Sequence, residues 1–285
     1  MRKIEQQFNE WLDYCENIQR LSAVTVQGKR FFIGEFLKGV DVDSIEKLTN
    51  DDVNRWIKSQ SKRGCESSTI NNRITHLRVA VKYFHDMGVA TPNLKMILIP
   101  KLRETPAPRK FYTPEQIEQV LALAKPFEWL LISLCYDCGF RISELRNLRL
   151  SNIDGQKILF IGKGRKWREV YMSAGTKERL DAYIEASGAS DYVFIGERQK
   201  PDKGPLTTEY IRQRMVGAFK RAGYNGFYPH SLRHSFATNL CKSGAPIAVT
   251  KEMLGHANIT TTERYIHALD GHLKDFFNEY KFAVN

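Results

Sequence analysis

A proline-rich segment from Ala90 to Lys110 divides the chain and limits how it can fold. It contains four prolines and many cations, and its apolar residues follow no sustained period. Because proline fixes the backbone and removes a helix donor, such a segment favours an extended linker. We therefore expect a linker over 90–110, between an N-terminal domain over 1–89 and a second domain over 111–285.

The sequence before the linker has the spacing of helices and no convincing strand. Apolar residues recur at helical spacing in four runs, and a glycine ends each of the second, third and fourth runs. We expect a four-helix bundle. The candidates for capping the third helix are Thr49 and Asn50, and those for the fourth are Ser67, Ser68 and Thr69.

The sequence after the linker predicts helices around one small sheet. Thr113 followed by Pro114 is typical of a helix start. Two β-prone runs, Lys157–Ile161 and Trp167–Met172, flank a Gly-Lys-Gly turn and predict a hairpin. The further predicted helices span Thr207–Arg221, Ser231–Ser243, Pro246–Leu254 and short pieces of Thr260–Tyr280. The expected fold class is mainly α with a small antiparallel β-sheet (α+β).

The charge of the chain indicates a polyanionic partner. Its net charge is +11 and its pI is about 9.4, and clustered cations bind a phosphate backbone by releasing counterions. Charge alone leaves nucleic acid and an anionic membrane surface both open. Because the sequence has no apolar run of membrane-spanning length and no signal-peptide pattern at its start, we expect a soluble, cytoplasmic protein.

Five thinly spread cysteines, an odd number, favour reduced thiols over a disulfide framework. Cys135 and Cys138 form a CxxC motif in an apolar, helical context without a second pair. We expect these two thiols to be buried packing residues next to Arg141 and not metal ligands.

Cations in the first half of the chain are candidates for binding DNA. Asn71, Asn72 and His76 accompany those on the fourth helix as further polar donors. A solvated helix face is the simpler explanation for this helix, while the linker cations suggest a strap that faces DNA. The candidates are Arg73, Arg78 and Lys82 on the helix and Arg103, Arg109 and Lys110 in the linker.

The candidate active site consists of two arginines, two histidines and a tyrosine. These residues lie in three sequence motifs, which are GFRISEL, HSLRHSFATNL and LGHANITTTERYIH. The arginine fork donates paired hydrogen bonds to phosphate, and a tyrosine beside such a cluster could attack the phosphorus. Removing one such donor typically costs about 10²–10³ in rate. The residues are Arg141, His230, Arg233, His256 and Tyr265.

Glu144 and Lys163 extend this set from two other places in the sequence. Glu144, three residues after Arg141, could orient an arginine or a histidine, and a surface ion pair is an equally good explanation for it. Lys163 lies between two glycines at the hairpin tip, where it could protonate a departing oxygen; most such tips are merely solvated turns. Its neighbours are expected to hold phosphates; they are Arg165, Lys166 and Arg168.

Together, GFRISEL, the GKG hairpin, HSLRHSFAT and LGHANITTTERYIH, in this order, resemble the tyrosine recombinase family of the Xer, Cre and phage integrase type. The resemblance covers Phe111 to the end, and the N-terminal bundle resembles the family's core-binding domain. It implies a site with the following residues and roles: Tyr265 as nucleophile, Arg141 and Arg233 as phosphate clamps, Lys163 as general acid, His230 as proton acceptor, and His256 and Glu144 as supporting residues.

The resemblance also implies a mechanism and partners. A 3′-phosphotyrosyl link would form without metal, ATP or another cofactor, and strand exchange would pass through a Holliday junction. The partners would be a double-stranded recombination site and a homo-tetramer, or a hetero-tetramer with a second recombinase, in the nucleoid. The helix Gly271–Tyr280 would dock into a neighbouring subunit, with a self-packed helix as the alternative.

The start of the sequence at the bundle leaves no room for an arm-binding domain, which favours a simple recombinase of the Xer kind. Three other interpretations share the motifs. They are an integrase or transposase of a mobile element, a type IB topoisomerase, and a catalytically inactive DNA-binding homologue.

Overall fold

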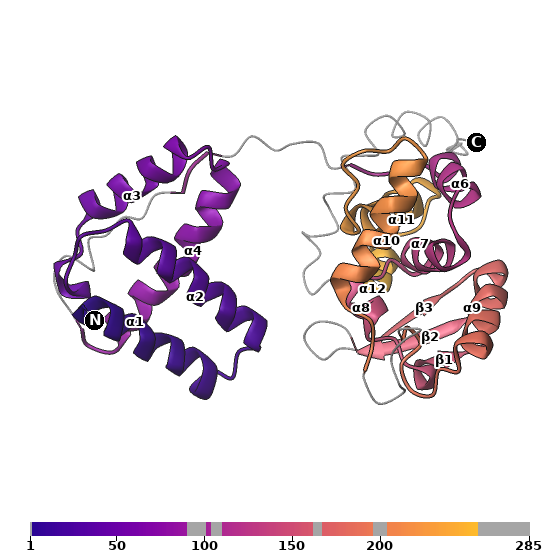
Figure 1. Ribbon diagram of the computed structural model, residues 1–285, viewed down its shortest axis with the longest axis horizontal. Coiled ribbons are helices and arrows are strands. Elements are labelled where there is room, and N and C mark those ends of the chain that lie inside the picture. Colours follow the sequence, from indigo (N-terminus) through magenta and orange to yellow (C-terminus); the bar gives the residue numbers. More distant parts are fainter. Residues whose placement is uncertain (1, 90–100, 104–109, 162–166, 196–203, 256–285) are drawn as a thin grey trace, which may run out of the picture. The chain divides into compact units, whose positions relative to one another are not determined.

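A computed structural model describes residues 2–89, 101–103, 110–161, 167–195 and 204–255 of the chain (Figure 1). The chain forms two compact units, 1–107 and 108–285. The described residues are mostly helical, with one small antiparallel sheet, which confirms the predicted fold class.

The N-terminal unit contains the four predicted helices. Phe8 lies in its core and packs edge-to-face on Trp11, Phe36 and Phe84, at ring-centroid distances of 6.4, 6.3 and 5.6 Å. Such aromatic pairs add to the stabilisation that burial provides. The helices are α1 (Lys3–Asp13), α2 (Ala23–Lys38), α3 (Asn50–Lys62) and α4 (Ser67–Asp86), with a π-helical turn at Tyr14–Ile18 and a 3₁₀ turn at Ile45–Lys47.

The caps of this unit agree only in part with the sequence. The Thr49 hydroxyl accepts a hydrogen bond from the Asp52 amide, which confirms the predicted cap of α3. The prediction for α4 is wrong: Glu66 is its N-cap residue and makes no side-chain capping bond. The serines and the threonine at 67–69 lie inside the first turn of α4 instead.

Part of the predicted linker packs on the N-terminal unit. The Asn71 side chain donates to the Leu102 carbonyl at 2.8 Å and accepts from the Leu102 amide at 2.7 Å. Leu102 packs against the N-terminal core. Asn71 is therefore buried and occupied by protein, contrary to its prediction as a surface donor, and residues 101–103 are fixed to this unit.

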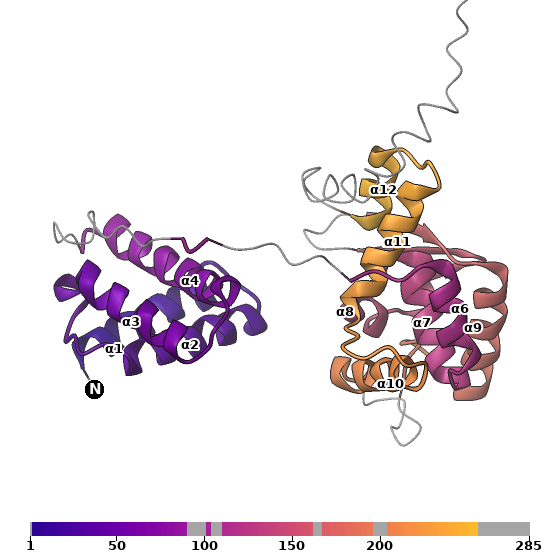
Figure 2. The same ribbon diagram turned by 90° about the horizontal axis from the view of Figure 1, so that it is seen from above.

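The described helices of the C-terminal unit are arranged around α7, which packs on α6, α8, α9, α10 and α11, while α12 packs on α11 (Figures 1 and 2). Pro114 begins α6 after the Thr113 cap, as predicted. The sequence analysis did not predict α9. The helices are α6 (Pro114–Ala122), α7 (Pro126–Cys138), α8 (Ile142–Arg146), α9 (Ala174–Ser187), α10 (Thr208–Arg221), α11 (His230–Lys242) and α12 (Ile247–Leu254).

The sheet consists of three antiparallel strands in the order β1-β2-β3. The two paired strands of the predicted hairpin are confirmed, while its Gly-Lys-Gly turn lies outside the described residues. Phe160 on β2 pairs with Arg168 on β3. Residues alternate between buried and exposed along β3, so Arg168 and Val170 lie on the buried face. The strand β1, which no sequence pattern predicted, has two residues and follows a 3₁₀ turn at Leu150–Asn152. The strands are β1 (Ile153–Asp154), β2 (Lys157–Ile161) and β3 (Trp167–Tyr171).

The two CxxC cysteines lie in the core of the C-terminal unit, as predicted. Cys135 and Cys138 are both fully buried on α7. Burial raises the pKa of both thiols, because it disfavours the thiolate. They are therefore protonated packing residues.

Candidate active site

A sharp helix end at Gly139 positions Arg141. Gly139 ends α7 with a φ of +61°, in the left-handed region that favours glycine. A Cβ at this position would also lie 2.6 Å from a ring carbon of Phe236. Neither the backbone angle nor the available space would accommodate a side chain at this position. Glycine therefore allows the chain to turn here, and Arg141 becomes the residue that precedes α8.

Glu144 is bound to Arg141 through both backbone and side chain. The Arg141 amide donates to Oε2 of Glu144 at 2.8 Å, and Nη1 of Arg141 donates to Oε1 at 2.6 Å. The Glu144 side chain is only 10% exposed. This burial rules out an ordinary surface ion pair and favours the orienting role.

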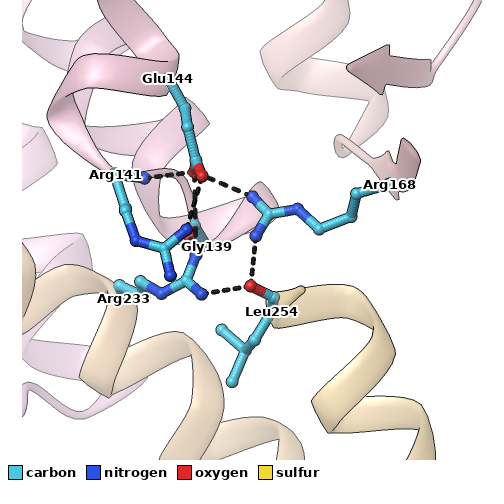
Figure 3. A network of polar contacts seen from close by, with 6 residues as sticks. All are labelled: Gly139, Arg141, Glu144, Arg168, Arg233 and Leu254. Carbon is cyan, nitrogen blue, oxygen red and sulfur yellow. Dashed lines mark hydrogen bonds and ion pairs between the residues drawn. The ribbon is translucent and has the colours of Figure 1, made fainter. Parts of the chain in front are cut away.

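Arg233 reaches the same place from the third position after the start of α11. Its side chain is 1% exposed. Nη1 donates to the Gly139 carbonyl at 2.7 Å and lies 3.8 Å from Oε2 of Glu144, while Nη2 donates to the Leu254 carbonyl. The structure therefore brings Arg141 and Arg233 together around one carboxylate (Figure 3).

Arg168 belongs to this cluster, which corrects its prediction as a phosphate-binding cation. Its side chain is 2% exposed and lies 3.1 Å from Oε2 of Glu144. It also donates to the Leu254 carbonyl, and its guanidinium lies 4.3 Å from the centroid of the Phe160 ring (Figure 3). Because it is enclosed and bound to protein groups, it has the contacts of an internal cation. The alternation along β3 is the signal that could have placed it inward.

Burial and the neighbouring charges shift the pKa of Glu144 in opposite directions. Burial raises the pKa of the carboxyl, but the Arg168 charge, the Arg141 amide and the charges of Arg141 and Arg233 outweigh burial, so its pKa lies below the ordinary 4.5. Glu144 is thus ionised at neutral pH. Burial also lowers the pKa of Arg168, against the effect of Glu144, yet a guanidinium stays charged in proteins.

The end of α12 is bound to the same arginines. The Leu254 carbonyl accepts from both Arg168 and Arg233, and Gly255 follows with a φ of +61°. A Cβ on Gly255 would lie 3.1 Å from Cδ of Arg168. The glycine therefore lets the backbone approach Arg168 directly before His256.

His230 begins α11, one residue before the predicted start, and is exposed. Its ring stands edge-on to that of His234, at a centroid distance of 4.6 Å. The remaining predicted site residues lie outside the described part of the chain, as does the helix predicted over 271–280. They are Lys163, Arg165, Lys166, His256 and Tyr265.

The other predicted DNA-binding cations differ in their surroundings. Arg73 is half-buried and donates to Gln60, and Arg78 is also half-buried. Lys82 is exposed and forms an ion pair with Asp86. Arg103 and Lys110 are exposed, and Lys110 donates to the Asn225 carbonyl at 2.6 Å. Arg109 lies outside the described residues.

Within the described ranges, no group of three or more His, Cys, Asp or Glu side chains could hold a metal ion. In the same ranges, no helix combines the length and apolar character needed to cross a bilayer.

The sequence profile of the phage integrase family matches residues 110–272, more than half of the chain. The chain belongs to the phage integrase family. This confirms the resemblance that the motifs indicated.

Two relatives of this chain match it over nearly all of its length. It is 30% identical to a tyrosine recombinase of Pseudothermotoga lettingae, over 98% of each chain. It is 28% identical to the tyrosine recombinase XerC of Anoxybacillus flavithermus, over 96% of this chain and 97% of that one.

A solved structure shares the fold. The crystal structure of the XerH site-specific recombinase bound to a palindromic difH substrate, a post-cleavage complex, matches with a TM-score of 0.76 at 18% identity. The match covers 92% of this chain and 81% of that one.

The charge balance around Glu144 gives a pH-dependent prediction. We expect Glu144→Gln to lower the stability of the C-terminal unit at neutral pH by about 3–5 kcal/mol, as breaking a buried ion pair does. Folding lowers the pKa of Glu144 below 4.5, so its stabilisation is complete above that pH and is lost as the pH falls through the folded-state value. Urea unfolding should show a difference between native and variant that narrows below pH 4.5.

Glu209→Gln is the control for this measurement. Glu209 forms an exposed ion pair with Arg212 on α10, and exposed pairs contribute little to stability. We expect only a small change at either pH. A difference for Glu144→Gln that stayed constant from neutral to acidic pH would contradict the assignment.

Proposed function

We propose that the chain is a site-specific DNA recombinase that cuts and rejoins strands through a covalent phosphotyrosyl intermediate. The convergence of Arg141 and Arg233 on one buried carboxylate is the observation that supports it most. Three guanidinium groups surround a single carboxylate, so these four side chains have a net charge of +2. A phosphodiester is an anion whose geometry suits an arginine fork. Membership of the phage integrase family supports the same proposal.

In the proposed mechanism, Arg141 and Arg233 bind the non-bridging oxygens of the scissile phosphate. The Arg141 side chain is 29% exposed and is the accessible clamp. Arg233 is enclosed, so we expect its bond to Leu254 to open as it binds the phosphate. The two arginines then stabilise the extra negative charge of the transition state.

Tyr265 is the proposed nucleophile. A free phenol has a pKa near 10, so few molecules are ionised at neutral pH, and nearby cations favour the phenolate. His230 accepts the phenol proton, the tyrosyl oxygen bonds to phosphorus, and the bond from phosphorus to the 5′ oxygen breaks. Lys163 protonates that oxygen, and His256 assists in holding the phosphate.

The second half of the reaction reverses the first on another strand. The released 5′-hydroxyl attacks the phosphotyrosyl link of a partner duplex, and Tyr265 is freed. Because the link retains the bond energy, the exchange needs no ATP. Four protomers would act in two rounds through a Holliday junction, on DNA in the nucleoid.

The other parts of the chain have supporting roles in this proposal. The N-terminal unit and the segment after it would hold the duplex through Arg73, Arg78, Lys82, Arg103, Arg109 and Lys110. Arg165 and Lys166 would bind phosphates near the hairpin tip, and the helix Gly271–Tyr280 would dock into a neighbouring protomer.

Tyr265→Phe tests the nucleophile. A nicked suicide duplex, built on a site selected by binding of the native chain to a DNA library, should give a denaturation-resistant adduct with the native chain and none with Tyr265→Phe. Removal of one hydroxyl leaves the fold and DNA binding in place, so binding in a gel shift is the control. An adduct formed by Tyr265→Phe would refute the assignment.

The same native chain should also join two duplexes into recombinant products. Supercoil relaxation without recombinants would favour a type IB topoisomerase, and binding without any adduct would favour an inactive homologue. Insertion of one duplex at many sites in another would favour the integrase or transposase of a mobile element.

Lys163→Ala tests the general acid. On a suicide duplex with an ordinary 5′ oxygen, we expect cleavage to slow by about 10²–10⁴, the range for loss of a placed acid. A 5′-phosphorothiolate leaves without needing a proton and should restore the rate. Lys157→Ala is the control: Lys157 lies on strand β2 of the same hairpin and forms an ion pair with Asp154. This variant should cleave both substrates at native rates. Equal losses for Lys163→Ala on both substrates would refute the acid role.

A further inference from the structure

Arg168 is a buried cation for which the proposed mechanism has no role. It lies on the buried face of β3, and its guanidinium stacks on the ring of Phe160 in the paired strand β2. Its contacts join three separate elements of the C-terminal unit: β3 itself, Glu144 of α8 and the Leu254 carbonyl that ends α12 (Figure 3).

Arg168 and Arg233 have two partners in common, the Leu254 carbonyl and the Glu144 carboxylate. Both arginines donate to the Leu254 carbonyl, and both lie near Oε2 of Glu144, at 3.1 Å for Arg168 and 3.8 Å for Arg233. Arg141 holds the other oxygen, Oε1. The shorter distance makes Arg168 the stronger ion-pair partner of Oε2.

The net charge of the cluster shows how Arg168 affects Arg141 and Arg233, the two arginines proposed to clamp the phosphate. With Arg168 present, three guanidinium groups share one carboxylate and the cluster keeps a net charge of +2, even though Arg141 itself is paired with Oε1 of Glu144 at 2.6 Å. Without Arg168, the carboxylate would have only the two clamp arginines as ion-pair partners among these residues. A buried carboxylate left in that state would compete with a phosphate for their donors and repel it.

We propose that Arg168 is a positioning residue that neutralises Glu144, so that Arg141 and Arg233 keep their charge for the scissile phosphate. Its bond to the Leu254 carbonyl holds the end of α12 against the same cluster. This inference rests on the proposed function, because it concerns how strongly that site binds a phosphodiester.

The test compares two duplexes that differ by one charge. In the first, the scissile linkage is a phosphodiester; in the second it is a methylphosphonate, in which a methyl group replaces one charged oxygen. Every protein includes Tyr265→Phe, so binding is measured without cleavage. The ratio of the two dissociation constants reports the interaction of the cluster with one phosphate charge. A change in overall folding would weaken both complexes and leave the ratio unchanged.

We expect the parent protein to bind the phosphodiester about tenfold more tightly, as a charged hydrogen bond would. If the free energy follows the net charge of the cluster, Arg168→Met lowers that charge from +2 to +1 and the ratio to about threefold. Arg168→Lys keeps the charge and should keep the parent ratio.

Arg149→Met is the matched control, because Arg149 forms an exposed ion pair with Asp191 and stacks on Tyr192 in the same unit. Its ratio should equal that of the parent. An unchanged ratio in Arg168→Met, or an equal fall in Arg168→Lys, would overturn the inference.

If Arg168→Met does not fold, the double variant Arg168→Met/Glu144→Gln tests the inference in its place. It removes both charges of a buried pair, which proteins often tolerate, and restores the cluster to +2. A ratio equal to that of the parent supports the inference and a lower one overturns it. A parent protein with no preference for the phosphodiester, or a native chain without a Tyr265 adduct, would instead contradict the proposed function.

Discussion

The C-terminal unit depends on one buried carboxylate. Glu144 is almost enclosed and lies among three guanidinium groups from α8, β3 and α11. Buried charges of this kind are costly unless they are paired and hydrogen-bonded. The cluster meets this requirement with an excess of cations, and in the proposed function that excess attracts the anionic phosphodiester.

Glycines and backbone carbonyls complete the arrangement. Gly139 ends α7 and offers its carbonyl to Arg233, while Gly255 follows the carbonyl that Arg168 and Arg233 share. Carbonyls at helix ends have no partner within the helix and bear partial negative charge. They can therefore hold the arginines without neutralising them. The glycines of the GFRISEL and LGHAN motifs serve this geometry as much as the charged residues do.

Local patterns in the sequence predicted most of the helices, the hairpin and the arginine pair. The Thr49 and Thr113 caps, the i, i+3 spacing of Arg141 and Glu144, and the start of α11 beside His230 all depend on neighbours in sequence. The two-residue strand β1 was missed although its partners on β2 lie only three and five residues away in sequence, because two residues are too few to show the alternation that identifies a strand.

The role of Arg168 could not be predicted from its neighbours alone. Its surroundings in the sequence, beside Arg165 and Lys166, suggested a phosphate contact, while its burial follows from strand alternation and from partners on α8 and α12. Asn71 was misjudged for the same reason, since its partner Leu102 lies within the predicted linker. In both cases a tertiary contact determined the role of a polar side chain.

A crystal structure of the DNA-free Glu144→Gln protein tests the central claim most directly. Glutamine has one acceptor oxygen and a donor amide that repels cations, so it can satisfy only part of the cluster. We predict that at most one of the Arg141 and Arg168 guanidinium groups keeps its hydrogen bond to residue 144, and that Arg168 withdraws from the Leu254 carbonyl. Three guanidinium groups in their native positions would show that the carboxylate does not organise the site.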